Sequence, residues 1–327
     1  MTEHRDLIHD WNEAEPRPAR PRAVKLNDES LRDGLQSPSV HDPSIEDKLE
    51  LIALMDRLGI HLVNVGLPAA SPRNLQDSVA ACQAIVEQRL AIRPVMAART
   101  VVGDIVPIAE IQQKVGIPCV AYAFIGTSEI RKLAESWDIE LIVKRSTEAI
   151  AFAVKEGVEV AYVTEDTTRA RPETLREIWK SALETGARRL CLADTVGHAT
   201  RDGVRNLVVF TRALIDETGI DGVGLDWHGH NDRGLALDNA LWALEYGIDR
   251  IHGCALGIGE RTGNTPMELL LLNLWLQSEL ELPDPSALDR YCEVAARACR
   301  WTGRRLSSDR GAAEWQALLA GFRAASA

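Results

Sequence analysis

The chain has 327 residues, of which 46% are hydrophobic and 26% are charged, and its formal net charge is −11. This composition is typical of a globular protein with a large core, and the acidic excess disfavours nucleic acids and anionic membranes as partners. No apolar run reaches the about 18 residues of a membrane span, and residues 1–22 lack the apolar stretch of a signal peptide. The six cysteines form no C-x-x-C pair, which favours reduced thiols and a cytoplasmic location.

Short segments rich in apolar and β-branched residues recur along the chain and predict strands. They lie at 23–30, 61–66, 92–99, 119–126, 159–166, 188–195, 222–230 and 250–257. The stretches between them carry apolar residues at helical spacing, which predicts helices at 44–58, 148–155, 172–185, 202–218 and 235–246. Several of these stretches end at a glycine, as helices commonly do: Gly59, Gly157, Gly186 and Gly247.

Strict alternation of strands and helices indicates a parallel sheet. Eight units favour an α/β fold that closes into a (β/α)8 TIM barrel, although an open α/β sheet with additional helices is an alternative. We expect an N-terminal leader at 1–22, a catalytic TIM barrel at 23–280 and a short helical C-terminal extension at 281–327. In a TIM barrel the chemistry lies at the carboxyl ends of the strands, and most of the predicted strands end in polar or charged residues.

A pair of histidines at the end of the seventh predicted strand is the sharpest feature. His228 and His230 stand two residues apart, so on a strand both face the same side and can share a metal ion. The alternative is a pair on a rim or a solvent face with hydrogen-bonded rings. Asp33 follows the first strand and Asn264 follows the eighth, and strands one, seven and eight are neighbours in a closed barrel. Such a mixed shell of nitrogen and oxygen ligands suits Mn²⁺, Zn²⁺, Mg²⁺ or Fe²⁺.

Three motifs carry a resemblance to a known family. They are L-R-D-G-x-Q at 31–36, H-x-H-N-D at 228–232 and G-x-G-E-R-x-G-N at 257–264. In this order and spacing they resemble the DRE-TIM metallolyase family, which holds isopropylmalate, homocitrate and citramalate synthases as well as hydroxymethylglutaryl-CoA lyase. The resemblance extends from about residue 26 to about residue 274. Further matches at 66–72, 164–166 and 194–197 favour the synthases.

The resemblance implies an activity. A synthase of this family joins an acyl-CoA co-substrate to a 2-oxo acid by a Claisen condensation, with a divalent metal ion at the ketone, and water then releases CoA. Family members are commonly homodimers or larger oligomers. The first alternative is lyase-like cleavage of a 3-hydroxyacyl-CoA, because the same groups can run the bond-forming step backward. The second alternative is a barrel that binds without turnover, and the retained metal-ligand set disfavours it.

The resemblance also implies roles for single residues. The expected metal ligands are Asp33, His228 and His230, with Asn264 as an outer or fourth ligand. The expected catalytic residues are Arg32, which would stabilise charge on the ketone oxygen, and Glu165, which would assist proton transfer. The substrate-binding candidates are Arg99, Thr195, Gln36 and Asn64. Glu165 could instead be a salt-bridge partner, and Arg99 and Thr195 could be hydrogen-bonding residues of the rim.

Some positions depart from the synthase pattern. Leu35 and Asn64 each stand where the synthases usually carry Glu. The synthases use a histidine from a C-terminal segment, whereas all eight histidines of this sequence lie at or before His252. These departures keep the lyase alternative open, but the Gly-Cys loop of the lyase is absent and Cys254 is expected to be a core thiol. The glycines Gly257, Gly259 and Gly263 either bring N–H groups to a phosphate or thioester or only let the loop turn.

Overall fold

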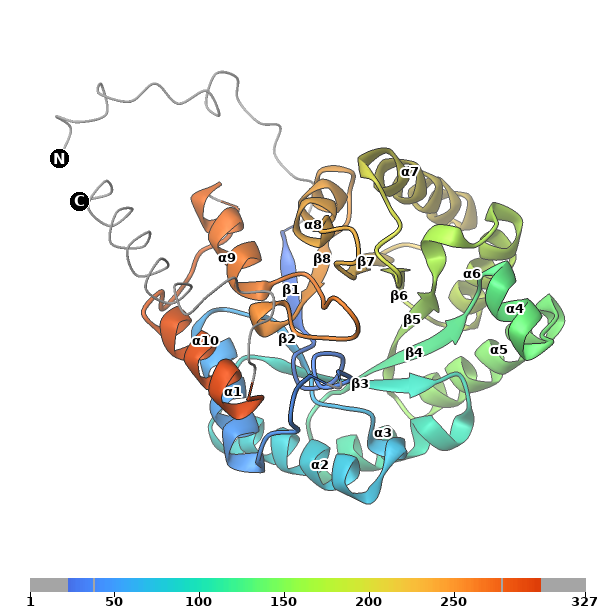
Figure 1. Ribbon diagram of the computed structural model, residues 1–327. Coiled ribbons are helices and arrows are strands. Elements are labelled where there is room, and N and C mark those ends of the chain that lie inside the picture. Colours follow the sequence, from blue (N-terminus) through green and yellow to red (C-terminus); the bar gives the residue numbers. More distant parts are fainter. Residues whose placement is uncertain (1–22, 38, 278, 301–327) are drawn as a thin grey trace, which may run out of the picture. The chain divides into compact units, whose positions relative to one another are not determined.

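A computed structural model describes residues 23–37, 39–277 and 279–300. Within them, parallel strands pair in sequence order from the first to the eighth, and the first pairs with the last, so that the sheet closes into a barrel (Figure 1). The strands are β1 (Lys25–Asp28), β2 (Leu62–Asn64), β3 (Arg93–Arg99), β4 (Val120–Gly126), β5 (Glu159–Glu165), β6 (Arg189–Asp194), β7 (Gly224–Gly229) and β8 (Arg250–Gly253). The (β/α)8 TIM barrel is therefore confirmed, and the open sheet is wrong.

Helices connect the strands and cover the outside of the barrel. They are α1 (Ile45–Arg57), α2 (Pro72–Glu87), α3 (Val102–Val115), α4 (Glu129–Glu135), α5 (Ile139–Lys155), α6 (Pro172–Thr185), α7 (Arg201–Thr218), α8 (Ala236–Glu245), α9 (Met267–Leu276) and α10 (Ala287–Ala298). Short 3₁₀ helices follow three strands: η3 (Pro68–Ala70), η4 (Thr167–Arg169) and η5 (Ala255–Gly257). The helix expected at 148–155 is the second half of α5, which begins nine residues earlier, at Ile139.

Local signals set the helix boundaries. The Ser44 side chain accepts a hydrogen bond from the Asp47 N–H at 3.2 Å and so begins α1. The expected stop at Gly59 is present in the left-handed region, with φ of +77°. Most predicted strands extend beyond the observed ones, because the residues that follow leave the sheet. After β8, for example, the Cys254 N–H bonds to the Thr265 carbonyl instead of to a neighbouring strand.

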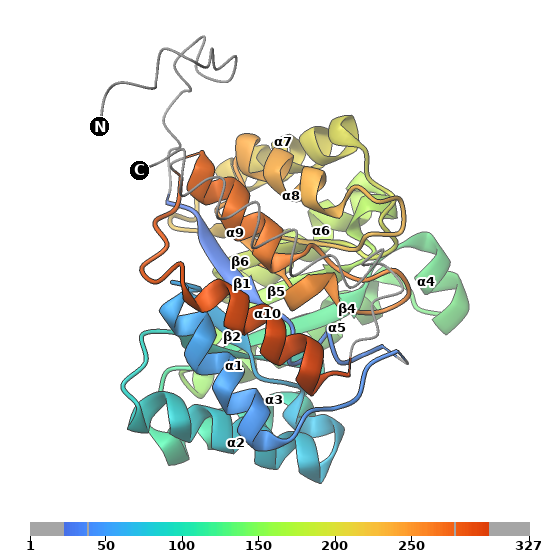
Figure 2. The same ribbon diagram turned by 60° about the vertical axis from the view of Figure 1, so that its left-hand side comes forward.

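The C-terminal helix α10 lies alongside α1 (Figure 2). Ion pairs join Arg290 to Glu50 at 2.6 Å and Arg297 to Asp47 at 2.8 Å. The helical C-terminal extension is thus present as α10, while residues 301–327 and the expected leader at 1–22 lie outside the described residues. The boundary at residue 280 stays a prediction. None of the described helices is long and apolar enough to cross a membrane.

The interior of the barrel contains a network of buried charges. Asp226, on the fully buried strand β7, accepts hydrogen bonds from Arg189 and from the Tyr122 hydroxyl, each at 2.6 Å. Burial alone would raise the pKa of Asp226, but Arg189 and Arg250 outweigh it and hold the pKa below its usual value. Because these charges are paired and hydrogen-bonded, the barrel tolerates them beneath the carboxyl ends of its strands.

A second buried acid supports the loop that follows β8. Glu268, in the first turn of α9, is 4% exposed and accepts a hydrogen bond from the Leu256 N–H at 2.8 Å. Burial raises the pKa of Glu268 to about 7. The folded protein therefore keeps a proton that the unfolded chain releases near its ordinary value of 4.5, so the free energy of unfolding should fall as the pH rises through this window.

We predict that Glu268→Gln abolishes this part of the pH dependence. The neutral amide still accepts the Leu256 N–H, so the variant should match the parent at pH 4 and be more stable at pH 8, by about 1–3 kcal/mol. Urea unfolding at the two pH values measures this difference. Equal destabilisation of the variant at both pH values would contradict the prediction.

Candidate active site

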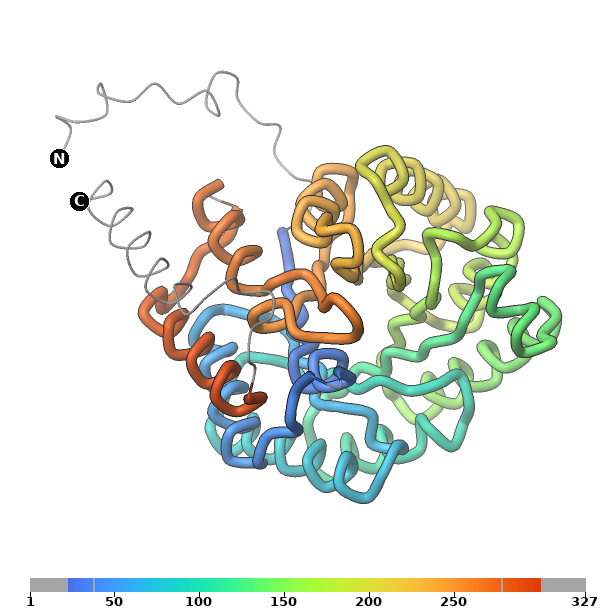
Figure 3. Tube along the Cα trace, viewed as in Figure 1, coloured from blue at the N-terminus to red at the C-terminus, as the bar shows by residue number. Residues whose placement is uncertain are grey.

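Three loops form the candidate site at the carboxyl ends of the strands. In Figure 3 the loop that follows β8 (orange) lies beside the loop that follows β1 (blue). The Ala255 N–H donates to the Ser30 hydroxyl at 2.7 Å, which joins these two loops. His230, which follows β7, forms an isolated antiparallel bridge with Asn264. The backbone thus brings segments more than 200 residues apart in the sequence into one layer.

Two glycines allow the loops to fold this closely. A Cβ on Gly34 would overlap the Ser30 carbonyl, so the turn that carries Arg32 and Asp33 requires glycine there. Gly259 has φ of +150°, and a Cβ on it would overlap the Asn264 side chain. The N–H groups of Gly257 and Gly263 bond to carbonyls within the loop. The structure therefore agrees with the expectation that these glycines let the loop turn. The N–H groups of Gly257 and Gly263 are not free to bind a phosphate or thioester.

Asp33, His228 and His230 come together as a buried cluster. Asp33 Oδ2 lies 3.1 Å from His228 Nε2 and 3.6 Å from His230 Nε2, and the two Nε2 atoms are 3.2 Å apart. The exposed fractions of the three residues are 2%, 8% and 5%. These ligand atoms can hold one metal ion. The cluster argues against a solvent-facing histidine pair.

The protonation states suit a metal site. Burial lowers the pKa of His230 to about 4, so its ring is neutral at pH 7. Burial would raise the pKa of Asp33, but Arg32 and the two histidines hold it far below its usual value, so Asp33 is ionised. The Asn264 carbonyl oxygen Oδ1 is buried without a hydrogen-bond partner. A neutral imidazole, a carboxylate and a free carbonyl oxygen are the forms that bind a divalent cation.

Arg32 lies at the edge of this cluster. Its Nε donates to Glu29 Oε2 at 2.9 Å, and its Nη1 lies 3.5 Å from Asp33 Oδ1. Burial disfavours its charge, but Glu29 and Asp33 more than compensate and raise its pKa. No role is predicted for Glu29 from the sequence, although a carboxylate three residues before Arg32 at a strand end is the pattern that could have indicated one.

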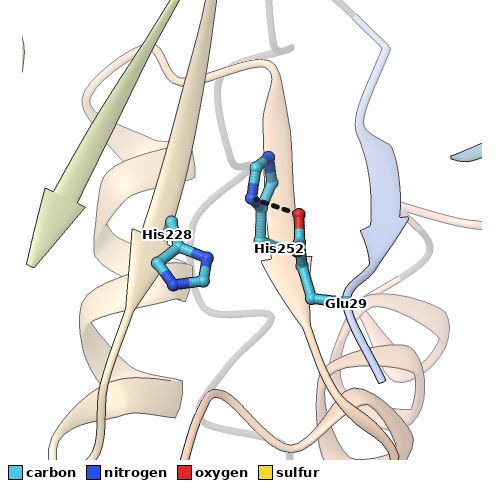
Figure 4. A group of neighbouring side chains, drawn as sticks. All are labelled: Glu29, His228 and His252. Carbon is cyan, nitrogen blue, oxygen red and sulfur yellow. Dashed lines mark ion pairs between the residues drawn. The ribbon is translucent and has the colours of Figure 1, made fainter. Parts of the chain in front are cut away.

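His252 of β8 is a second residue of the site for which the sequence predicts no role. Its Nδ1 lies 3.3 Å from Glu29 Oε1, and its Nε2 lies 3.2 Å from Asp226 Oδ2. In Figure 4 its ring faces Glu29, and the ring of His228 from β7 lies beside them. His252 therefore links the candidate site to the buried charges of the barrel interior.

A cavity of about 240 Å³ opens above these groups. Its lining residues come from most of the strand ends: Glu29, Arg32, Asp33, Gln36, Leu67, Ala97, Tyr122, Phe124, Val163, Glu165, Cys191, Ala193, Thr195, His228, His230, His252 and Glu260. Seven of the ten expected site residues are among them. The other three are Asn264, which lies in the loop that follows β8, Asn64 and Arg99.

Asn64 and Arg99 do not line the cavity, although Glu29, the partner of Asn64, does. Asn64 is buried and donates from Nδ2 to Glu29 Oε2 at 2.9 Å, so it lies behind Glu29. Arg99 donates from Nε to Asp104 Oδ2 at 2.8 Å, and its side chain is 64% exposed. In this structure neither residue reaches the cavity, because each side chain satisfies a neighbouring carboxylate.

Glu165 and Thr195 both line the cavity. Glu165 Oε2 lies 4.0 Å from Arg131 Nη2, a weak contact for a salt bridge. Burial is the largest cause that raises the pKa of Glu165. The Thr195 hydroxyl accepts a hydrogen bond from the Asp166 N–H at 2.8 Å, which leaves its own hydrogen free to donate.

Cys254 lies beside the site without lining it. It is fully buried and packs with Ile258 and Cys299. Burial raises the pKa of its thiol well above the usual value. Its expected place as a core thiol is confirmed, and a thiol so placed is a poor acid or nucleophile for chemistry in the cavity.

The HMGL-like family model matches residues 23–295. The chain belongs to this family. It is 32% identical over 263 residues to a probable 2-isopropylmalate synthase of Methanopyrus kandleri, covering 80% of this chain and 50% of that protein. It is also 32% identical to the mitochondrial homocitrate synthase of Schizosaccharomyces pombe, covering 79% of this chain and 58% of that one. The chain thus spans about half the length of the curated relatives it matches.

Solved structures share the fold. The hydroxymethylglutaryl-CoA lyase of Pseudomonas aeruginosa superposes with a TM-score of 0.69 at 22% identity, covering 93% of this chain and 99% of that one. The family comparison agrees with the DRE-TIM resemblance of the three motifs. The synthases named above are relatives in sequence, whereas the lyase, at 22% identity, shows the fold alone.

Proposed function

We propose that this protein condenses an acyl-CoA with a 2-oxo acid and releases CoA by hydrolysis. The observation that carries the proposal is the cluster of Asp33, His228 and His230 on the cavity wall with the Arg32 guanidinium beside it. A ketone that reaches this corner would meet a metal ion and a fixed cation at its oxygen. The synthases at 32% identity support condensation over cleavage.

The three clustered side chains would hold the metal, with Asn264 Oδ1 as a fourth or outer ligand. We infer Mn²⁺, Zn²⁺ or Mg²⁺, because the set combines imidazole with oxygen ligands. When bound, such an ion supplies Lewis-acid polarisation of the ketone. It would also offset the carboxylates Glu29, Asp33, Glu165 and Glu260, which line the cavity.

The protein side chains would stabilise charge, transfer protons and bind the 2-oxo acid. Arg32 stabilises the negative charge that forms on the ketone oxygen as the thioester enolate carbon attacks the ketone carbon. Glu165 assists proton transfer, which its raised pKa favours. Thr195 donates its free hydroxyl hydrogen to the carboxylate of the 2-oxo acid. Arg99 could assist only after its ion pair with Asp104 is broken, and Gln36 remains a candidate on the wall.

The cavity walls suggest the substrate class. Leu67, Ala97, Phe124 and Val163 present apolar surface. Among the described lining residues, Arg32 is the only arginine or lysine, and Glu29 already binds it. A second carboxylate on the substrate would therefore lack a partner and face acidic side chains. We propose a 2-oxo monocarboxylic acid with an apolar side chain.

A substrate panel tests the proposal. The Mn²⁺-loaded protein is incubated with acetyl-CoA and pyruvate, 2-oxoisovalerate or 2-oxoglutarate, and free thiol is followed. We expect release with one of the first two acids, and at least about tenfold less with 2-oxoglutarate, because an unpaired buried charge costs more than 1.4 kcal/mol. Cleavage of a 3-hydroxyacyl-CoA without any condensation would establish the lyase instead. Silence in both assays would favour a non-catalytic barrel. Assembly as a homodimer or larger oligomer stays a prediction.

A further inference from the structure

Glu29 is a buried carboxylate, only 1% exposed, whose two oxygens have defined partners. Oε2 accepts hydrogen bonds from Arg32 Nε and Asn64 Nδ2, each at 2.9 Å, and Oε1 accepts one from Asn27 Nδ2 at 2.7 Å. These donors come from β1, from β2 and from the loop after β1. The carboxylate is therefore held in place from several sides.

Arg32 depends on this carboxylate for its position. Both its Nε and its Nη2 point to Glu29 Oε2, and its other carboxylate contact is the longer one to Asp33, at 3.5 Å. A free arginine side chain has many rotamers, and ordering it in the transition state would cost entropy. With Nε and Nη2 held by Glu29, the Nη1 edge is directed toward Asp33 and the metal ligands before substrate arrives.

Asn64, on the neighbouring strand β2, lies directly beside the Glu29 carboxylate. The synthases that the chain resembles usually carry Glu at this position, and here its amide lies 2.9 Å from the Glu29 carboxylate. An acid at either position would place its oxygens within reach of Arg32. A glutamate at position 64 would therefore stand beside the place that the Glu29 carboxylate now occupies.

We infer that Glu29 is the positioning residue that holds Arg32 beside the metal ligands, and that a glutamate at position 64 could take its place. The part of this inference that concerns turnover rests on the proposed function. Glu29 is not the chemical acid or base in this scheme; it acts through the guanidinium of Arg32.

The competing role for Glu29 is that of a metal ligand. Glu29, His228 and His252 lie close enough to hold an ion (Figure 4). Positioning is favoured because both Glu29 oxygens already accept hydrogen bonds. In addition, His252 Nε2 already lies within hydrogen-bond distance of Asp226 Oδ2, at 3.2 Å. The two roles differ in what happens to metal content when Glu29 becomes an amide.

The test is a double-mutant cycle on Glu29→Gln and Arg32→Lys in the full chain. Oxalate, a mimic of a chelating 2-oxo acid, is titrated into the Mn²⁺-loaded proteins by calorimetry, and bound metal is counted by elemental analysis. We expect Glu29→Gln to keep its metal and bind oxalate about tenfold more weakly, since a charge-assisted hydrogen bond is lost. The double variant should be no weaker than Arg32→Lys alone, because both changes remove one interaction.

Rescue provides the second readout. Glu29→Ser should weaken oxalate binding, and adding Asn64→Glu should restore it to within about threefold of the parent. Glu50→Gln, the same change at a glutamate that pairs with Arg290 outside the cavity, is the matched control and should leave oxalate affinity unchanged. Loss of metal in Glu29→Gln, or additive effects in the cycle, would overturn the inference. If the Ser/Glu variant does not fold, the cycle with its conservative changes decides alone.

Measuring turnover distinguishes a failure of this inference from a failure of the proposed function. If the parent condenses a 2-oxo acid, Glu29→Gln should lower kcat about tenfold or more with little change in the KM for the acyl-CoA, as expected for a group that acts in the transition state. If the parent turns over no substrate of the panel but the oxalate cycle is non-additive, the proposed function fails and the positioning of Arg32 stands.

Discussion

Replacing Asp33 with alanine is expected to remove the bound divalent ion and to lower the rate of thiol release by about 10³-fold or more, because the Lewis-acid contribution of a metal is worth several kcal/mol. Asp33 Oδ2 lies close to the Nε2 atoms of both histidines, at 3.1 and 3.6 Å. Without it, two imidazoles remain, and they bind a hard cation weakly. Elemental analysis after gel filtration and the thiol assay measure the two effects.

Stability gives an independent check on Asp33. Mn²⁺ should raise the melting temperature of the parent, since it binds the folded chain, and should leave the melting temperature of Asp33→Ala unchanged. Asp202→Ala, on an exposed position in the first turn of α7, is the control and should keep both the metal and the shift. An Asp33→Ala variant that retains one ion per chain would remove Asp33 from the ligand set.

The second large effect is expected at Arg32. Arg32→Ala should lower kcat by about 10²–10³-fold, the range observed when one donor to a developing oxyanion is removed. Metal content should stay at the parental level, because Arg32 borders the cluster without contributing a ligand atom. The KM for the 2-oxo acid should change less than kcat, because the guanidinium acts on charge that forms in the transition state. Steady-state kinetics with the best acid of the panel give both values.

Two comparisons sharpen the Arg32 prediction. Arg32→Lys keeps the charge but loses the contact of two guanidinium nitrogens with Glu29. Its kcat should therefore lie between the kcat of the parent and that of Arg32→Ala. Arg57→Ala removes an exposed arginine that pairs with Asp284 far from the cavity, and its kinetics should be those of the parent. If Arg32→Ala raised KM and left kcat intact, Arg32 would serve binding and not the chemical step.

Much of this protein is predictable from local patterns. Alternating strands and helices in eight units predicted the barrel, and the two-residue period of a strand placed His228 and His230 on one face. The rule that chemistry lies at the carboxyl ends of TIM-barrel strands indicated where Asp33, Arg32 and Glu165 would meet. These inferences succeed because they depend on backbone geometry, which repeats along the chain and is readable over a few residues.

The roles of other residues were decided only by contacts between strands. Glu29 and His252 contact each other, and His252 also contacts Asp226, so these contacts join three different parts of the chain. Asn64 and Arg99 stand at strand ends as expected, yet their side chains turn to Glu29 and Asp104. The sequence by itself determined which strand ends carry polar side chains. Only the tertiary structure decided which of them face the cavity, because a buried polar side chain points to whatever partner satisfies it, and that partner lies far away in the sequence.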